Sequence, residues 1–194
     1  MLDSKARKYI QPLIDRTADF LIGYDLTATQ VTWIAFAVGV SAGLFSYWGL
    51  SLLAVIMLWT SGYLDAVDGS IARKNNNATA WGTVLDVTFD RVVEIAVILA
   101  LGLRYPDAQF TLLILASAII LSMTIFLTVG SVSKNKGKKS FYYQAGVAER
   151  TEGFIFLTLM ILFSDWIILF TAIFAAAVLF TALQRLLEAK KILG

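Results

Sequence analysis

Five carboxylates lie inside two long apolar stretches of the sequence, about 50–72 and 82–103. They are Asp65, Asp68, Asp86, Asp90 and Glu94. A charge at mid-depth in a membrane helix costs about 2.5 to 3.5 kcal/mol even on the insertion scale, so acids at such places indicate function. Several carboxylates this close would repel one another strongly unless a cation lay between them. The pattern therefore predicts a cation site.

Helical spacing brings these acids onto facing surfaces. At 100° per residue, Asp65 and Asp68 share an arc of about 100° with Gly69 and Ala72. The other three acids follow at i, i+4 and i+8 on one face of the next helix, and two antiparallel helices would present the two faces to each other. Because the chain has no histidine and no cysteine, the all-oxygen set favours Mg²⁺, Mn²⁺ or Ca²⁺ over zinc or copper.

A flat wall is expected beside the acids. Gly69 and Ala72 leave little side chain on the face that carries the first two aspartates, so a flat or bulky ligand can approach the backbone. Arg73 adds a planar cation just past this wall. Metal-binding carboxylates, a flat wall and an arginine together suit a diphosphate attached to a base. The alternative is a structural network with Arg73 and Arg91, but two arginines cannot neutralise five carboxylates.

The segment from Asp65 to Asp90 resembles the signature of the CDP-alcohol phosphotransferase family. It reads D-x2-D-G-x2-A-R-x8-G-x3-D-x3-D, and every specified position is filled. The resemblance implies a homodimeric membrane enzyme that transfers a substituted phosphoryl group from a CDP-linked donor to an alcohol and releases CMP. A lipid donor such as CDP-diacylglycerol and a small alcohol acceptor are expected.

The same resemblance implies roles for the motif residues. The expected metal ligands are Asp65, Asp68, Asp86 and Asp90. The expected donor-binding residues are Asp68, Gly69, Ala72, Arg73 and Gly82. The expected cofactor is Mg²⁺ or Mn²⁺, with two ions favoured over one. Asp90 is also the expected general base, and the composition agrees, because without histidine a carboxylate must accept the proton of the attacking hydroxyl.

The composition requires most of the chain to be embedded in a membrane. Of its 194 residues, 58% are apolar and 15% are charged, whereas a soluble domain carries roughly 25% charged residues. A spanning helix needs about 20 mainly apolar residues, so about six spans are the most the chain can supply. The apolar stretches place them at about 31–48, 50–72, 82–103, 110–132, 146–163 and 166–187. The expected fold class is an all-α polytopic membrane protein with six transmembrane helices.

Residues 1–26 mix charged and apolar residues at a helical spacing, which is typical of an amphipathic helix on a membrane surface. An ordinary solvated helix packed on the core is the alternative. Thr27 or Thr29 is placed to cap the helix that follows. Residues 27–194 are expected to form one transmembrane catalytic domain, since no repeat or linker divides them.

Two further features of the spans concern packing and orientation. Gly39 and Gly43 have the G-x-x-x-G spacing that permits close helix approach, and we interpret them as packing residues. With the N-terminus in the cytoplasm, only Arg104 among the lysines and arginines falls on the opposite side. The positive-inside rule therefore predicts a multi-pass cell (inner) membrane protein with both termini and the active site on the cytoplasmic side.

A basic loop follows the fourth predicted span. It contains Lys134, Lys136, Lys138 and Lys139. Attraction to anionic lipid headgroups is favoured over substrate binding for this loop. A nucleic-acid partner is not expected, because the patch is short and adjoins a membrane.

Acceptor-binding residues are expected at the head of the fifth span and in the last span. Glu149 and Glu152 either accept hydrogen bonds from hydroxyls or an amine, or simply favour the helix dipole. Arg150 offers a cation for a phosphate or carboxylate. Arg185 either lines the same cytoplasmic mouth or anchors the last helix. The sequence identifies neither the donor lipid nor the acceptor alcohol.

A carboxylate-lined divalent-cation transporter is the alternative function. It accounts for acids inside the membrane, but not for the flat wall beside Arg73. The motif aspartates also lie near one membrane face rather than along a pathway across it. The sequence therefore favours an enzyme.

Overall fold

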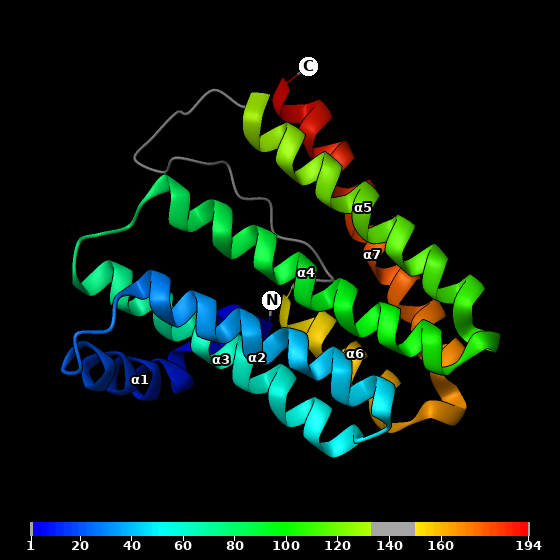
Figure 1. Ribbon diagram of the computed structural model, residues 1–194. Coiled ribbons are helices and arrows are strands. Elements are labelled where there is room, and N and C mark those ends of the chain that lie inside the picture. Colours follow the sequence, from blue (N-terminus) through cyan, green and yellow to red (C-terminus); the bar gives the residue numbers. More distant parts are fainter. Residues whose placement is uncertain (1, 133–149, 194) are drawn as a thin grey trace. The chain divides into compact units, whose positions relative to one another are not determined.

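The computed structural model describes residues 2–132 and 150–193, and every regular element in these ranges is a helix (Figure 1). The predicted all-α class is confirmed. The long helices are α1 (Leu2–Ile22), α2 (Ala28–Trp48), α3 (Ser51–Lys74), α4 (Ala80–Arg104), α5 (Gln109–Val132), α6 (Arg150–Leu162) and α7 (Ile167–Leu193). Short 3-10 helices η1 (Pro106–Ala108) and η2 (Ser164–Trp166) precede α5 and α7.

Four stretches in the described part of the chain are long and apolar enough to cross a membrane. They are α2, α3, Pro106–Val132 and Ser164–Lys191. The helix α4 is equally long but contains Asp86, Asp90, Arg91 and Glu94, and the described part of α6 has 13 residues. The chain is therefore a membrane protein with several spanning helices, while the predicted number of six stays a prediction.

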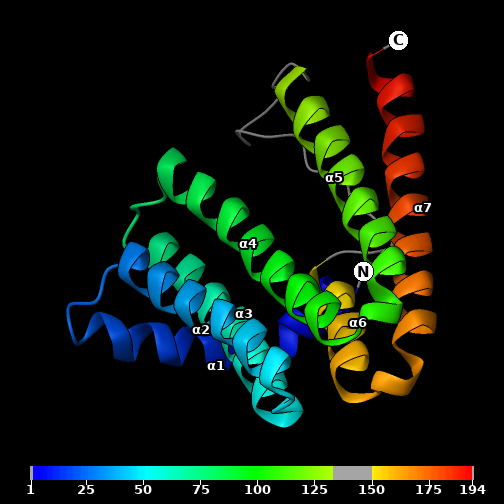
Figure 2. The ribbon, with the colours of Figure 1, turned by 45° about the vertical axis from the view of Figure 1, so that its right-hand side comes forward.

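The chain divides into two compact units. One comprises Ser4–Pro106 and the other comprises Met1–Asp3 with Asp107–Gly194. In the first unit α2 packs against both α3 and α4, and in the second α5 packs against α7 (Figures 1 and 2). The acidic motif belongs entirely to the first unit.

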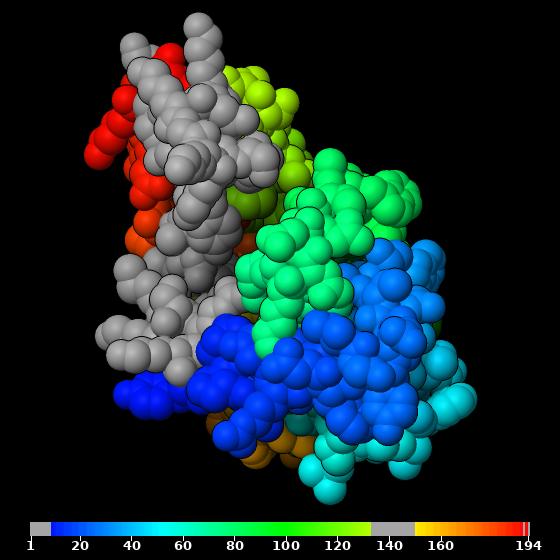
Figure 3. Space-filling model, turned by 90° about the vertical axis from the view of Figure 1, so that its left-hand side faces the viewer, coloured from blue at the N-terminus to red at the C-terminus, as the bar shows by residue number. Residues whose placement is uncertain are grey.

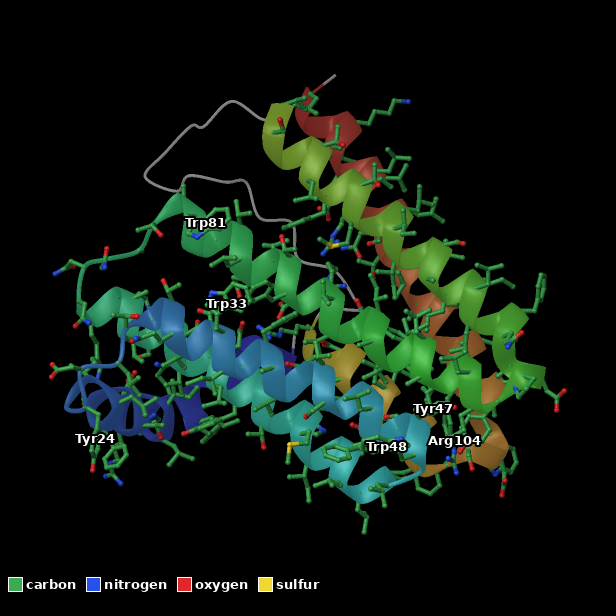
Figure 4. All side chains as sticks on the ribbon, in the orientation of Figure 1. Tyr24, Trp33, Tyr47, Trp48, Trp81 and Arg104 are labelled. Carbon is green, nitrogen blue, oxygen red and sulfur yellow. The ribbon has the colours of Figure 1, made fainter. Side chains whose placement is uncertain are left out.

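Both ends of α2 are fixed by local chemistry. Thr27 Oγ1 accepts a hydrogen bond from the Gln30 amide at 3.3 Å, and the Gln30 side chain accepts one from the Thr27 amide at 2.8 Å. This capping box confirms Thr27 as the cap. The helix ends at Gly49, whose φ of +79° is left-handed. There the Arg104 guanidinium donates to the Tyr47 carbonyl at 2.9 Å, close to Trp48 (Figure 4).

Gly39 and Gly43 lie where α2 meets its neighbours, so their interpretation as packing residues is confirmed. A Cβ added to Gly39 would lie 2.4 Å from Val93 Cγ2 of α4 and 2.6 Å from Ser61 Oγ of α3. A Cβ on Gly43 would lie 2.8 Å from the Ala96 carbonyl oxygen of α4. Only a residue without a side chain allows the backbones to come this close.

The helix α1 packs one face on the end of α3 that carries the motif. Ile14 and Ala18 are buried in a cluster with Val31, Val67 and Ile71. Two polar contacts flank this cluster: Ser70 donates to Asp15 at 2.7 Å, and Lys74 forms an ion pair with Asp19 at 2.5 Å.

The outward face of α1 carries large apolar side chains. Tyr9, Leu13 and Phe20 are exposed on it, and the described surface of α1 is dark blue in Figure 3. The helix is therefore two-sided: one face packs on α3, and the other presents apolar and aromatic groups outward.

Candidate functional site

Three of the motif aspartates meet in the structure. Asp65 of α3 and Asp86 and Asp90 of α4 each offer a carboxylate oxygen, and these oxygens all lie within 4.8 Å of one another. All three residues are partly buried. We call this set the carboxylate trio. The prediction that two helices present acids to each other is confirmed for these residues.

The turn between α3 and α4 sets the depth at which these acids meet. At 1.5 Å per residue, Asp65 lies about 14 Å before the end of α3, while Asp86 and Asp90 lie about 9 and 15 Å after the start of α4. Asp65 therefore lies at about the same distance from the turn as Asp86 and Asp90, because the chain reverses direction within a few residues. Asn76 is left-handed with φ of +50°, and Thr79 Oγ1 caps α4 by accepting from the Gly82 amide at 3.0 Å.

The remaining acids of the stretch have different surroundings. Glu94 is 7% exposed and pairs with Arg91, three residues earlier on α4. Asp68 is buried at 8% exposure, about one turn along α3 from Asp65. It is not one of the three residues whose oxygens meet, so its role as a metal ligand stays a prediction.

Arg73 lies over the glycine of the predicted wall. A Cβ added to Gly69 would lie 3.3 Å from Arg73 Nη1, so the arginine side chain folds back by one turn toward this residue. Ala72 is partly buried, and Arg73 is exposed. A cation and a stretch of nearly bare backbone therefore occupy the same part of α3, as the sequence predicted.

Gly82 takes part in the cap at the start of α4. Its amide is the group that Thr79 caps, and a Cβ would lie 3.2 Å from Thr79 Oγ1. This distance is somewhat shorter than ordinary van der Waals contact. Its predicted part in donor binding stays a prediction.

A cavity of about 190 Å³ lies beside Ala72, between the start of α2 and the end of α3. Its lining residues are Ile22, Asp25, Leu26, Thr27, Ala28, Ile71, Ala72, Asn75 and Asn77. Besides Thr27, the cap of α2, the polar lining residues are Asp25, Asn75 and Asn77, which were not among the predicted site residues. They belong to turns, where helical periodicity gives no signal.

The candidate acceptor residues belong to the second unit, where the structure describes three of the four. Arg150 begins α6 with its guanidinium 5.6 Å from the centre of the Phe154 ring, and Glu152 is partly buried in the same first turn. Arg185 is 7% exposed and contacts α5, donating to Ser122 Oγ at 3.3 Å. This contact agrees with the anchoring interpretation of Arg185, while acceptor binding stays a prediction. Glu149 and the lysines from 134 to 139 lie outside the described residues.

Comparisons with known proteins give consistent matches over nearly the whole chain. A family model described as CDP-alcohol phosphatidyltransferase matches residues 25–183. The archaetidylinositol phosphate synthase of Pyrococcus horikoshii is 29% identical over 97% of this chain and 96% of its own. The inner membrane protein YnjF of Escherichia coli is 31% identical over 95% of this chain and 93% of its own.

The fold also matches a solved structure. The crystal structure of Mycobacterium tuberculosis phosphatidylinositol phosphate synthase with CDP-DAG bound has a TM-score of 0.77 to this chain at 23% identity. The match covers 92% of this chain and 94% of that one. At this identity the likeness shows a shared fold.

Proposed function

Because this chain belongs to the CDP-alcohol phosphatidyltransferase family, we propose that it moves a phosphatidyl group from CDP-diacylglycerol, or a closely similar CDP-linked lipid, to a small alcohol. Family membership makes it an enzyme of phospholipid synthesis that uses a CDP-alcohol donor. The observation that carries the proposal is the carboxylate trio, formed by three aspartates of the family motif.

The carboxylate trio fits a hard divalent cation. Three carboxylate oxygens from two helices within 4.8 Å of one another form the kind of all-oxygen set that Mg²⁺ and Mn²⁺ prefer. We propose that Asp65, Asp86 and Asp90, together with Asp68, hold two such ions. When bound, the metal neutralises the donor diphosphate and stabilises the departing CMP oxygen. The crystal structure of the M. tuberculosis synthase in complex with manganese and citrate supports a divalent cation of this kind.

The protein side chains position the donor and manage the proton. Asp90 accepts the proton of the acceptor hydroxyl, whose oxygen forms a bond to the phosphatidyl phosphorus as the bond from that phosphorus to the CMP oxygen breaks. Arg73 supplies a permanent positive charge for the diphosphate, and its guanidinium lies beside Gly69, where the donor is proposed to bind.

The cavity beside Ala72 is the proposed place for the cytosine base. It adjoins the wall where the diphosphate is expected, and Asp25, Asn75 and Asn77 line it with hydrogen-bonding groups. Cytosine presents an amino donor and carbonyl and ring-nitrogen acceptors, which carboxylate and amide side chains can satisfy. Gly82, at the start of α4, is proposed to leave clearance for the same nucleotide.

The proposed acceptor is a phosphorylated polyol. The P. horikoshii relative is named an archaetidylinositol phosphate synthase and the M. tuberculosis structure is that of a phosphatidylinositol phosphate synthase. Both names describe a lipid that carries an inositol phosphate, which supports a polyol phosphate as the acceptor here. Arg150 and Arg185 would bind the phosphate, since guanidinium groups pair with phosphate oxygens through two parallel hydrogen bonds. Glu149 and Glu152 would accept hydrogen bonds from the polyol hydroxyls.

We further propose a homodimer in the cell (inner) membrane with six spans per chain. Helices occupy all six predicted places within the described residues, and nearly all lysines and arginines fall on one side of this topology. Both termini and the carboxylate trio would then face the cytoplasm. Residues 1–26 would lie on that surface with Tyr9, Leu13 and Phe20 against the lipid, and residues 27–194 would form the catalytic domain.

A direct assay tests the reaction. Purified protein in detergent is supplied with CDP-diacylglycerol, Mg²⁺ and a panel of polyols, polyol phosphates, amino alcohols and serine, and CMP is measured. CMP release that requires an acceptor and disappears in Asp86→Asn supports the proposal. Absence of CMP with every acceptor, accompanied by ion flux in sealed vesicles, would instead support a carboxylate-lined transporter.

A further inference from the structure

Gly39 lies where α2 touches both helices of the carboxylate trio. On α3 its neighbour is Ser61, one helical turn before Asp65. On α4 its neighbour is Val93, three residues after Asp90. The glycine therefore faces one side chain of α3 and one of α4, each about one turn away from the acids.

There is no room for a side chain at this position. The missing Cβ would lie 2.4 Å from Val93 Cγ2, 2.9 Å from Val93 Cγ1 and 2.6 Å from Ser61 Oγ. Rotating Val93 exchanges one close methyl for the other, and a helical valine has one strongly preferred rotamer. Ser61 is held as well, because its hydroxyl donates to the Ala35 carbonyl at 2.7 Å.

We propose that Gly39 sets the spacing of α3 and α4 at the carboxylate trio and thereby adapts the site to a small divalent cation. The inference rests on the proposed function, since it requires the trio to bind metal. Bringing a Cβ from 2.4 Å to an ordinary contact of 3.4 Å requires a displacement of 3.4 − 2.4 = 1.0 Å. Because helices move largely as rigid rods, part of this displacement reaches the carboxylates one turn away.

A displacement of this size at the carboxylates should affect the binding of Mg²⁺ and Ca²⁺ differently. Mg²⁺ binds oxygen ligands at about 2.0 to 2.1 Å in a nearly ideal octahedron, whereas Ca²⁺ accepts about 2.3 to 2.6 Å in variable arrangements. The three carboxylate oxygens lie within 4.8 Å of one another, and separating the helices would move these ligands away from a shared small ion. Widening the trio should therefore penalise Mg²⁺ more than Ca²⁺.

The test is the relative affinity of the full-length protein in detergent for Mg²⁺ and Ca²⁺, measured by calorimetry without substrate. In Gly39→Ala we expect Mg²⁺ affinity to fall by about 10- to 100-fold, the usual cost of disturbing the support of a metal site. Ca²⁺ affinity should fall clearly less, so the preference shifts toward the larger ion.

Two matched variants separate spacing from general damage. Gly43→Ala introduces the same methyl group on α2, but its nearest contacts are all with Ala96, six residues beyond Asp90, so it should shift the ion preference much less. Adding Val93→Ala to Gly39→Ala removes both close methyl groups and should restore part of the Mg²⁺ affinity. If Gly39→Ala does not fold, Val93→Ile enlarges the same contact from the α4 side and is judged by the same ion ratio.

The outcomes are distinguishable. An equal loss for both ions, or no change in either, would overturn the spacing inference while leaving the metal site in place. Failure of the unaltered protein to bind any divalent cation would refute the proposed metal site itself. A selective loss of Mg²⁺ that Val93→Ala partly reverses supports the inference.

Discussion

Replacing Asp90 with asparagine separates proton acceptance from metal binding in the carboxylate trio. The amide has nearly the size of the carboxylate and still offers an oxygen, but it cannot accept the proton of an attacking hydroxyl at neutral pH. A positioned acid-base group is worth about 10²- to 10⁴-fold in rate. At about 1.36 kcal/mol per tenfold, this corresponds to a barrier increase of about 2.7 to 5.4 kcal/mol.

The structure also predicts how Asp90→Asn should affect the binding of Mg²⁺ and of the CDP-linked donor. After Asp90→Asn, Asp65 and Asp86 still contribute two charged ligands from the two helices, and Gly69 and Arg73 are untouched. The affinities for Mg²⁺ and the CDP-linked donor should therefore change much less than the rate of CMP release. Asp86→Asn provides the contrast, since it removes a proposed metal ligand but leaves the proposed base in place, so turnover should fall in step with metal binding rather than far more than it.

Glu94→Gln is the matched control for charge. It removes a carboxylate one turn beyond Asp90 on the same helix, but Glu94 pairs with Arg91 and lies outside the carboxylate trio. Turnover should stay close to that of the unaltered protein, while thermal stability falls because Arg91 loses its partner. Equal losses of donor binding, Mg²⁺ binding and rate in Asp90→Asn would refute its role as a base, and a near-normal rate would remove Asp90 from the mechanism.

Three further predictions concern stability in detergent. Gly49→Ala should cost about 1 to 2 kcal/mol, because an L-residue is strained in the left-handed conformation seen at φ of +79°. Thr27→Ala should cost about 1 kcal/mol, since it breaks the capping box with Gln30; both are measured as free energies of unfolding. Hydrogen bonds from Ser70 and Gln11 lower the pKa of the Asp15 carboxyl in the folded protein. The ionised carboxylate should therefore stabilise the fold at pH values above the ordinary carboxyl pKa of about 3.9. This stabilisation should be lost as the pH falls through the lower pKa of the folded state. Asp15→Asn should therefore reduce the difference in melting temperature between pH 7 and pH 3.

Each of these three predictions can fail clearly. An unchanged free energy of unfolding in Gly49→Ala or Thr27→Ala would show that the corresponding end of α2 does not depend on that residue. Retention of the full pH difference in Asp15→Asn would assign acid sensitivity to other carboxylates.

Helical periodicity explains which parts of the site were predictable. The spacing of Asp65, Asp86 and Asp90 places them on facing surfaces, and the structure brings them together. Glu94 shares the same face by spacing, yet it pairs with Arg91. Periodicity places a residue on a face, whereas the choice of partner depends on side-chain rotamers and burial that the sequence does not encode locally.

The contact partners of the glycines and the turn residues that line the cavity were less predictable from the sequence, because both depend on the three-dimensional arrangement of the helices. The spacing of Gly39 and Gly43 predicts close approach but not the partner, and Val93 and Ser61 became identifiable only in three dimensions. The cavity is lined partly by turn residues such as Asp25, whose φ of +57° is left-handed. Among the described residues four stretches are long and apolar enough to span a membrane, because the acids of the motif make α4 less apolar than an ordinary transmembrane helix and the described part of α6 has 13 residues.

The division of the chain into two compact units has an evolutionary consequence. Every residue of the aspartate motif belongs to Ser4–Pro106, whereas Arg150, Glu152 and Arg185 belong to the unit that includes Asp107–Gly194. The proposed donor chemistry and the proposed choice of acceptor are thus encoded in separate stretches of the gene. On these proposed roles, substitutions that retarget the enzyme to a new alcohol would accumulate in the later stretch while selection preserves the earlier one. A chimaera joined near residue 106 tests this, because it should exchange acceptor preference without altering the motif.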